Sequence, residues 1–410
     1  MSTQQRALSR GRANLVLATL FVGMFVLGSA ELLVVGVLNL IAADLHVSIP
    51  TAGTLVTGYA LGLAIGGPIL TALTIRFDKR TVLIGALVLF ILGNLVTVLT
   101  ADYALFLTAR VVTGALQGLF IAAAFAAGIA VVPPERMGRA ISVIISGVAV
   151  SAALGVPLGT LAGQALGWRG SFTAIVVLSS VALIATLALV PSAPSSGGGA
   201  GDQARHAFAP RVLAVLFLTF LVFAALYAAL TYIVPFLESV TGISGALISV
   251  FLLVYGMATA VGSFGGGRFA DRNAARTLSI ATIGLAASLL ALYFVGSIAF
   301  LVALVLLAGG VFGFGMVPSL QYRVISLAGP GGALAQSLPA SAANLGIAFG
   351  STAGGMAISG FSSSAAVLTG LIIAALAIAV AWATSFLKAP VTEEPPAAVP
   401  DRTAPDMAGS

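Results

Sequence analysis

Two ionisable residues stand deep within apolar sequence, and they are the first candidates for chemistry in this chain. Glu31 is the only acidic residue well inside a long apolar stretch, and Arg110 is the only basic residue in such a position. An ionised side chain at the centre of a membrane helix costs about 2.5–3.5 kcal/mol on insertion scales, so residues of this kind are functional candidates by default. The sequence therefore predicts a proton-coupling site formed by Glu31 and Arg110.

Simple helix geometry gives the depths of these two residues, which differ by about 8 Å. Glu31 stands thirteen residues before Asp44, roughly 20 Å from that end of its helix at about 1.5 Å per residue. Arg110 stands eight residues after Asp102, roughly 12 Å from the same side. Helix tilt and the long arginine side chain allow the two groups to meet directly or through water. The alternative is a buried pair that only fixes helix packing.

The rest of the chain offers little material for catalysis. Cysteine is absent, which excludes disulfides, thiolate metal ligands and cysteine nucleophiles, and the two histidines, His46 and His206, lie far apart in the sequence. There is no Gly-x-x-x-x-Gly-Lys-Ser/Thr loop that could bind ATP. We therefore expect no enzyme activity, no cofactor and no metal site. We also expect no nucleic-acid binding, because the basic residues are scattered in short loops.

The elements that must position Glu31 and Arg110 are membrane helices. Apolar residues make up 60% of the 410 residues and charged residues only 7%, whereas soluble domains carry about 25% charged residues. Since a membrane helix needs roughly 20 mostly apolar residues, we expect an all-α protein in the lipid bilayer with twelve spans. The expected spans are 14–42, 51–74, 82–100, 104–131, 139–164, 171–191, 212–236, 245–268, 278–296, 298–321, 333–359 and 364–387.

Basic residues are unevenly distributed between the two sides of these spans. All 18 Lys and Arg residues except Arg169 and the intramembrane Arg110 fall on one side. Loops rich in Lys and Arg remain in the cytoplasm. The sequence therefore predicts a multi-pass protein of the cell (plasma) membrane with both termini in the cytoplasm.

A flexible stretch rich in Ser, Gly and Pro divides the spans six and six. The expected organisation is a cytoplasmic N-terminus (1–13), a six-helix bundle (14–191), a cytoplasmic linker (192–210), a second six-helix bundle (211–387) and a disordered cytoplasmic tail (388–410). A shift of 196 residues aligns Tyr59 with Tyr255 and Arg76 with Arg272. The halves are thus expected to be repeats around a central cavity, with the substrate site at midmembrane between them.

The turn between the second and third helices of each half resembles a signature of the major facilitator superfamily. The second-half copy reads Gly-Gly-Arg-Phe-Ala-Asp-Arg over 266–272, and the first-half copy lacks the acidic residue. The resemblance covers nearly all of 14–387. It implies charge contacts that latch the cytoplasmic gate. The residues that carry this role are Arg76, Arg80, Asp271, Arg272 and Arg276.

Two further motifs resemble one branch of this family, the twelve-helix drug:proton antiporters. In span five, Gly155, Pro157 and Gly159 resemble the Gly-Pro motif of exporters, which implies a second gating element. The first span, with Gly-Ser-Ala-Glu-Leu over 28–32, is similar to actinobacterial chloramphenicol-resistance exporters and arabinose-efflux-like permeases. The sequence is therefore interpreted as an exporter and not as an importer.

The expected substrate cavity combines aromatic and polar side chains, as small-molecule sites commonly do. The candidate lining residues are Tyr59, Asn94, Gln117, Phe223, Tyr227, Thr231, Tyr255 and Asn344. Each of the polar residues among them could instead form a hydrogen bond that only packs helices.

The expected function is proton-coupled efflux by antiport of a small neutral or weakly charged amphipathic compound, such as a chloramphenicol-like drug. Glu31 would take up a proton when the site faces out and release it when substrate binds from inside. The transport alternative is a sugar, nucleoside or other metabolite exporter, and the non-transport alternative is a receptor or scaffold. We expect a monomer.

Overall fold

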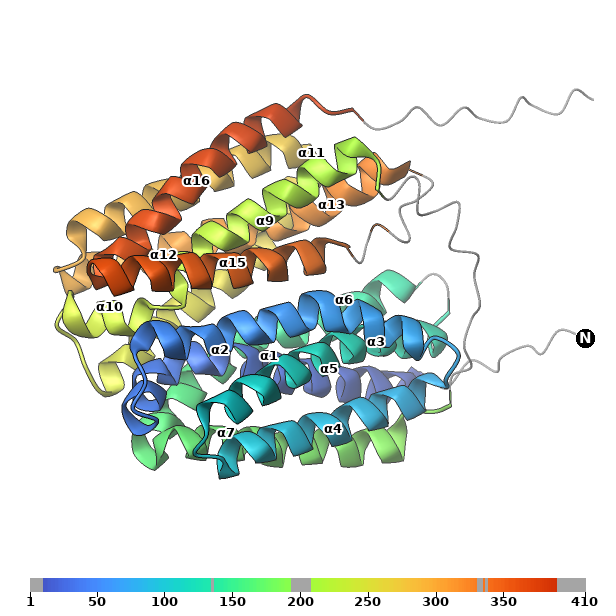
Figure 1. Ribbon diagram of the computed structural model, residues 1–410. Coiled ribbons are helices and arrows are strands. Elements are labelled where there is room, and N and C mark those ends of the chain that lie inside the picture. The colour runs from blue at the N-terminus through green and yellow to red at the C-terminus, as the bar shows by residue number, and fades with distance from the viewer. Residues whose placement is uncertain (1–9, 134–135, 193–207, 330–334, 336–337, 389–410) are drawn as a thin grey trace, which may run out of the picture.

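The computed structural model describes residues 10–133, 136–192, 208–329, 335 and 338–388 (Figure 1). These residues form helices and no strand, which confirms the all-α prediction for this part of the chain. The expected N-terminal segment 1–13, linker 192–210 and tail 388–410 lie largely outside the described residues.

The first half consists of six membrane spans, two of which contain a π-helical turn. The second span runs through such a turn at Gly62–Gly66, and the fifth runs through one at Ser151–Gly155. Gly167, at φ 76°, breaks α7 into the end of span five and the whole of span six, and a glycine adopts this φ without steric penalty. The elements are α1 (Arg10–Asp44), α2 (Ile49–Leu61), η1 (Gly62–Gly66), α3 (Gly67–Leu73), α4 (Lys79–Leu99), α5 (Tyr103–Ala130), α6 (Met137–Val150), η3 (Ser151–Gly155) and α7 (Val156–Leu189).

The second half supplies the other six spans. Its elements are α9 (Pro210–Leu230), α10 (Ile233–Ser239), α11 (Ala246–Val295), α12 (Ala299–Gly315), α13 (Val317–Ala328), α15 (Leu338–Gly360) and α16 (Ser363–Ser385). Asn273 leaves the helical conformation and breaks α11 into spans eight and nine. Ten stretches are long and apolar enough to cross a membrane. Because one of these, Arg139–Leu189, holds two spans and α15 adds another, the twelve expected spans are present.

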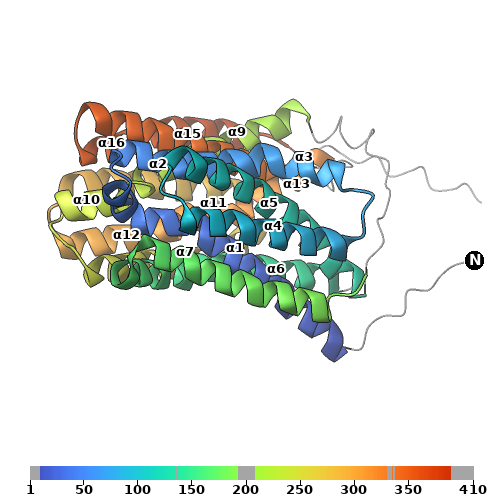
Figure 2. The ribbon, with the colours of Figure 1, turned by 60° about the horizontal axis from the view of Figure 1, so that its bottom comes forward.

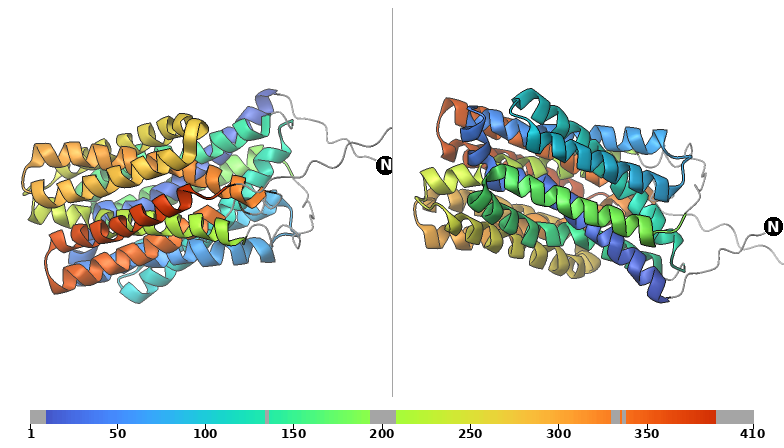
Figure 3. Two further views of the ribbon diagram at one scale, coloured as in Figure 1. Left: turned by 90° about the horizontal axis from the view of Figure 1, so that it is seen from above. Right: turned by 90° about the horizontal axis from the view of Figure 1, so that it is seen from below.

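The two halves form separate bundles that lie side by side with their helices running in the same general direction (Figures 1 and 2). The start of α1 and the end of α16 lie at one end of the molecule, here called the terminal end, and the opposite end is called the far end (Figures 1 and 3). Because the number of spans is even, the first and the last span must have their outer ends on the same side of the membrane. That the terminal end faces the cytoplasm remains a prediction.

Glycines allow the helices within each bundle to approach closely. A Cβ atom on Gly114 of α5 would collide with the carbonyl oxygen of Tyr59, and one on Gly310 of α12 would meet the carbonyl oxygen of Tyr255. Small residues serve this purpose in membranes, where helices are not driven together by the hydrophobic effect. Gly310 and Tyr255 are the positions that a shift of 196 residues assigns to Gly114 and Tyr59, so the repeat seen in the sequence is also a repeat of contacts.

The two bundles are joined by hydrogen bonds in the part of the membrane nearer the far end. Where both partners are described, four hydrogen bonds cross between the halves. They are Asn39 to Glu238, Thr57 to Ser351 (2.7 Å), Thr57 to Thr352 (3.2 Å) and Gln164 to the carbonyl oxygen of Gly245 (2.7 Å). Asn39 lies on the last turns of α1, and Thr57 lies in the second half of α2. Their partners lie on α10 and in the last half of α15, and Gln164 and Gly245 lie just before Gly167 and α11. The molecule is therefore held closed at its far end.

Candidate functional site

Arg110 is the largest fully buried side chain among the described residues. Its guanidinium donates to the carbonyl oxygens of Ala30 (2.9 Å) and Glu31 (3.1 Å), and its Nε atom donates to that of Leu55 (3.4 Å). The guanidinium carbon lies 3.9 Å from the centre of the Tyr59 ring, a cation–π distance. Backbone oxygens and an aromatic face therefore take the place of water around this charge.

The Glu31 carboxylate has a different partner. Its Oε2 atom accepts a hydrogen bond of 2.6 Å from the side-chain amide of Gln117, and the carbonyl of that amide accepts one from the Tyr59 hydroxyl. Because Tyr59 also lies against Arg110, the four side chains form one continuous polar network: Glu31, Gln117, Tyr59 and Arg110. The network joins α1, α2 and α5.

The direct meeting of Glu31 and Arg110 allowed by the sequence does not occur in this structure. Within the described part of the chain, the one ion pair closer than 4 Å joins Arg169 to Asp44, near the far end. Arg110 reaches the backbone of Glu31 and not its carboxylate. Gln117 stands seven residues after Arg110, a spacing that places both on one face of α5. Gln117 was expected only in the substrate cavity, and this shared face is the feature of the sequence that could have linked it to Arg110.

Glu31 borders a cavity between the two halves. Its lining includes Glu31, Val56, Tyr59, Tyr227 and Ile347. The first three come from the first half and the last two from α9 and α15 of the second half. The network therefore reaches the interface between the repeats, where a substrate would bind in a transporter of this design.

The other candidate lining residues are more widely spread. Phe223 stacks on Tyr227, with ring centres 6.5 Å apart, and so extends the aromatic wall of the second half. The Thr231 hydroxyl is buried without a partner among the described residues. Asn94 and Asn344 each donate to a carbonyl oxygen four residues earlier in their own helix, Phe90 and Ala340, and neither lines the Glu31 cavity. Tyr255 lines a separate cavity within the second bundle.

Among the described side chains, no hydrogen bond or ion pair joins the candidate gating residues at the terminal end to one another. Arg76, Arg272 and Arg276 are exposed, and Arg80 donates to the carbonyl oxygen of Leu187 at 2.6 Å. The side chain of Asp271 lies outside what the structure describes. The latch implied by the resemblance thus stays a prediction.

The glycine-proline motif of span five packs mainly against α1. A Cβ atom on Gly155 would collide with the side chain of Ser29, and one on Gly159 would collide with that of Leu33. Ser29 and Leu33 lie two residues before and two residues after Glu31 in the sequence. Pro157, between these glycines, is buried. Across the interface, the same region meets α11, where a Cβ atom on Gly256 would collide with the backbone of Ala152. The motif therefore connects the helix that carries Glu31 with the other half.

Comparison with known proteins identifies similar sequences and folds. A family model described as Major Facilitator Superfamily matches residues 20–337. The inner membrane transport protein YdhP of Escherichia coli (strain K12) is 32% identical over 372 residues, which cover 90% of this chain and 95% of that protein. A chloramphenicol resistance protein of Streptomyces lividans is 30% identical over 341 residues, covering 82% and 87%. A bacterial homologue of the human lysosomal transporter Spinster, solved inward-facing and occupied, shares the fold with a TM-score of 0.77 at 15% identity, covering 92% of this chain and 97% of that one.

Proposed function

This chain belongs to the major facilitator superfamily, and from that premise we propose that it exports a small neutral or weakly charged amphipathic compound in exchange for protons. Its relatives are transporters, and the chain is a membrane transporter and not an enzyme. The observation that carries the proposal is the position of Glu31, whose carboxyl group borders the cavity between the halves and is held by Gln117.

The network supports a carboxyl group that can change its charge without breaking an ion pair. Arg110 is held by backbone oxygens and by the Tyr59 ring, so protonation of Glu31 leaves its hydrogen bonds intact. The Gln117 amide carries both donors and an acceptor, so it can bond to either form of the carboxyl group. In the proposed cycle, Glu31 takes up a proton when the cavity opens outward, and substrate entering from the cytoplasm favours release of that proton inward.

The lining of the cavity fits an amphipathic substrate better than a strongly polar one. Val56 and Ile347 are aliphatic, Tyr59 and Tyr227 combine an apolar ring with a hydroxyl group, and Phe223 lies behind Tyr227. Such a surface binds through apolar contact, and a few polar groups fix the orientation of the ligand. A drug of the chloramphenicol type has this character, and a chloramphenicol resistance protein is among the similar proteins.

The test is chloramphenicol accumulation in cells that express the protein, measured with and without a protonophore. We expect low accumulation in cells that express the unmodified protein. We expect high accumulation when the protonophore is added to these cells, or when the cells express the Glu31→Gln variant instead. Glu393→Gln, which changes an acidic residue of the expected tail in the same way, serves as the matched control and should behave like the unmodified protein.

Each deviation from this result has a defined meaning. Glu31→Gln cells that still export at full rate in a protonophore-sensitive manner would show that the proton is carried elsewhere. Accumulation that expression leaves unchanged would remove chloramphenicol as a substrate and direct the search to sugars, nucleosides and other metabolites.

A further inference from the structure

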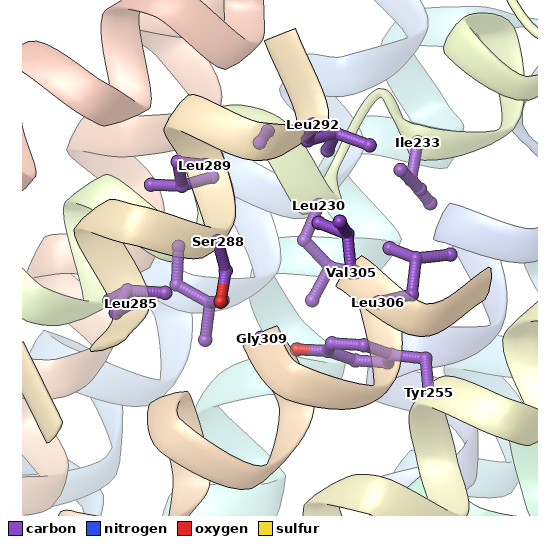
Figure 4. Close-up of a pocket in the computed structure, with 12 residues that line it drawn as sticks. Leu230, Ile233, Tyr255, Leu285, Ser288, Leu289, Leu292, Val305, Leu306 and Gly309 are labelled. Carbon is purple, nitrogen blue, oxygen red and sulfur yellow. The ribbon is translucent and has the colours of Figure 1, made fainter. Parts of the chain in front are cut away.

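Span seven is interrupted at Tyr232, and the break directs this side chain toward the other half. α9 ends at Leu230 and α10 begins at Ile233, with Tyr232 between them at φ −111° and ψ 20°. Pro235 accounts for the break, because it has no N–H for the carbonyl oxygen four residues earlier and its ring crowds that oxygen. Leu230 and Ile233 face the leucine-lined interior of the second bundle (Figure 4). Tyr232 instead contacts α2 and α15.

The tip of the Tyr232 side chain is held between two glycines, one from each half. A Cβ atom on Gly53 of α2 would collide with the Tyr232 hydroxyl oxygen, and a Cβ atom on Gly355 of α15 would collide with the same oxygen. Only 1% of Tyr232 is exposed, so no open space lies beside its ring. Its hydroxyl group donates to the carbonyl oxygen of Ser351 at 2.8 Å. Gly53 and Gly355 thus form a recess, here called the glycine notch, and Tyr232 fills it.

The glycine notch lies on the far-end side of the cavity beside Glu31. The second, seventh and eleventh spans each supply one residue to the lining of that cavity and one residue to the surroundings of the notch. These pairs are Val56 and Gly53, Tyr227 and Tyr232, and Ile347 and Ser351. In each pair the second residue lies three to five residues nearer the far end, which is roughly 5–8 Å at about 1.5 Å per residue. Tyr232 therefore stands between the cavity and the far end.

Tyr232 is also linked to the hydrogen bonds that join the halves. Ser351 accepts from Tyr232 through its carbonyl oxygen, and its hydroxyl group pairs with that of Thr57 in the first half at 2.7 Å. α15 and α9 are packed closely, because a Cβ atom on Gly350 or Gly354 would collide with carbonyl oxygens of α9. The second half therefore presents Tyr232 and Ser351 to α2 as one surface.

We infer that Tyr232 is the residue that closes the cavity beside Glu31 toward the far end, by fitting into the glycine notch. Position 53 then requires glycine, because a larger residue meets the phenol and pushes the second half away from α2. The hydrogen bond of Tyr232 to Ser351 lies within the second half. Separation of the halves therefore withdraws the phenol from Gly53 without breaking that bond. The inference concerns closure of the far end and neither the proton nor the exported compound.

The test measures the distance between two spin labels at the far end. The chain has no cysteine, so Ala101→Cys and Ser297→Cys are labelled alone. Both residues are exposed in far-end loops, one in each half. Purified full-length protein is placed in lipid nanodiscs, and the distance distribution is recorded by double electron–electron resonance. We expect Gly53→Ala to raise the ratio of long to short distances by about tenfold, because the added methyl group overpacks the notch.

Gly58→Ala is the matched control for the added methyl group. Gly58 lies on the same helix, and the nearest atom to its added Cβ is the Leu107 Cδ1 atom of the first half, at 2.7 Å. Leu107 is only partly buried, so its side chain can move aside. We expect the distance distribution of Gly58→Ala to match that of the labelled protein without either glycine change.

Two changes of Tyr232 test the fit from the other side. The three atoms nearest to a Cβ on Gly53 all belong to the Tyr232 side chain. Gly53→Ala/Tyr232→Ala should therefore restore the short distances, which a general loss of stability would not do. Tyr232→Trp overfills the notch with Gly53 in place and should lengthen the distance as Gly53→Ala does, so it provides the same test should Gly53→Ala fail to fold.

Two outcomes would overturn the inference. One is a distribution that neither Gly53→Ala nor Tyr232→Trp changes more than Gly58→Ala does. The other is a Gly53→Ala/Tyr232→Ala protein that keeps the long distances. The measurement needs no substrate and no proton gradient, so the inference and the proposed proton-coupled export can each fail alone.

Discussion

At the scale of single residues, the unusual feature of this protein is a buried arginine, Arg110, that makes no ion pair closer than 4 Å with a described residue. The Arg110 guanidinium is surrounded by helix carbonyl oxygens and the Tyr59 ring, while Glu31 is held by an amide. Arginine suits this position because its planar fork can donate to several fixed acceptors and stack on an aromatic face at the same time. A lysine has the charge but not the fork, so the two residues are not equivalent here.

The first prediction concerns Gln117, which links Glu31 to Tyr59. Gln117→Leu removes a hydrogen bond to a charged group, worth about 1.5–3 kcal/mol, and should lower protonophore-sensitive export by about ten- to hundredfold. Initial rates of export from preloaded cells measure the effect. Asn94→Leu is the matched control, because Asn94 bonds only to the carbonyl of Phe90 in its own helix. Equal losses in the two variants would show that the Gln117 link has no special role.

The sequence was sufficient to find the charged residues but not to connect them. Glu31 and Arg110 were detectable because they are the only ionisable residues deep within apolar stretches. Whether Arg110 bonds to the carboxylate or to the backbone of Glu31 depends on small rotations of α1 about its axis, and these arise from packing against α5 and α7. Tyr255 shows the same limit. Its alignment with Tyr59 was visible, but its separate cavity depends on the smaller residues that surround it.

At the scale of elements, glycines set the distance between the halves. The Gly256 position of α11 lies against the backbone of Ala152 in η3, across the interface between the bundles. The region around η3 also packs on α1 beside Glu31 through Gly155. The segment around η3 therefore contacts both the other half and the helix that carries the carboxyl group.

The second prediction concerns this contact. Gly256→Ala should separate α11 from η3 and destabilise the protein by about 1–3 kcal/mol, the usual cost of overpacking, with a clear loss of export. Gly265→Ala lies on the same helix, where an added Cβ has no atom within 4 Å, and should leave both properties unchanged. Tm of the purified variants and export rates provide the measurements. Export at the normal rate from Gly256→Ala would show that the close contact is not needed for transport.

The boundaries of the spans were largely predictable, but the breaks within long helices were not. Spans eight and nine were expected as 245–268 and 278–296 with a loop between them, whereas α11 remains helical through most of this loop. Asn273 provides the break, and its side chain accepts from the backbone N–H of Arg276, as an N-cap does where a helix restarts. A hydropathy pattern shows only which residues are apolar enough to lie in the lipid. It therefore cannot distinguish a charged loop from a charged helical turn at the membrane surface.

At the scale of the whole molecule, the structure shows one closed end. Four hydrogen bonds between described residues join the two halves, and all of them lie toward the far end. Those of Thr57 lie nearest the middle of the molecule. A transporter that alternates its access must break these bonds once in each cycle. If the protein transports as proposed, the far end is therefore one of its two gates.

The third prediction uses the absence of cysteine from this chain. The Thr57 and Ser351 hydroxyl oxygens are 2.7 Å apart, so cysteines at these positions have their sulfur atoms within reach of a disulfide bond. Oxidation of the Thr57→Cys/Ser351→Cys protein should stop export, and a reducing agent should restore it. Each single variant is a control that oxidation should not affect. A cross-linked protein that still exports at full rate would show that this contact does not open during transport.

A single carboxyl group in the cavity between the repeats also has an electrical consequence. On the proposed exchange, Arg110 keeps its charge and Glu31 carries one proton per cycle, so export of a neutral solute moves one net positive charge inward. Each such charge is worth about 2.3 kcal/mol for every 100 mV across the membrane. A potassium diffusion potential imposed with valinomycin, negative inside and without any pH difference, should then drive export from vesicles with the native orientation. An electroneutral response would mean that the solute itself carries a positive charge or that the proton stays behind.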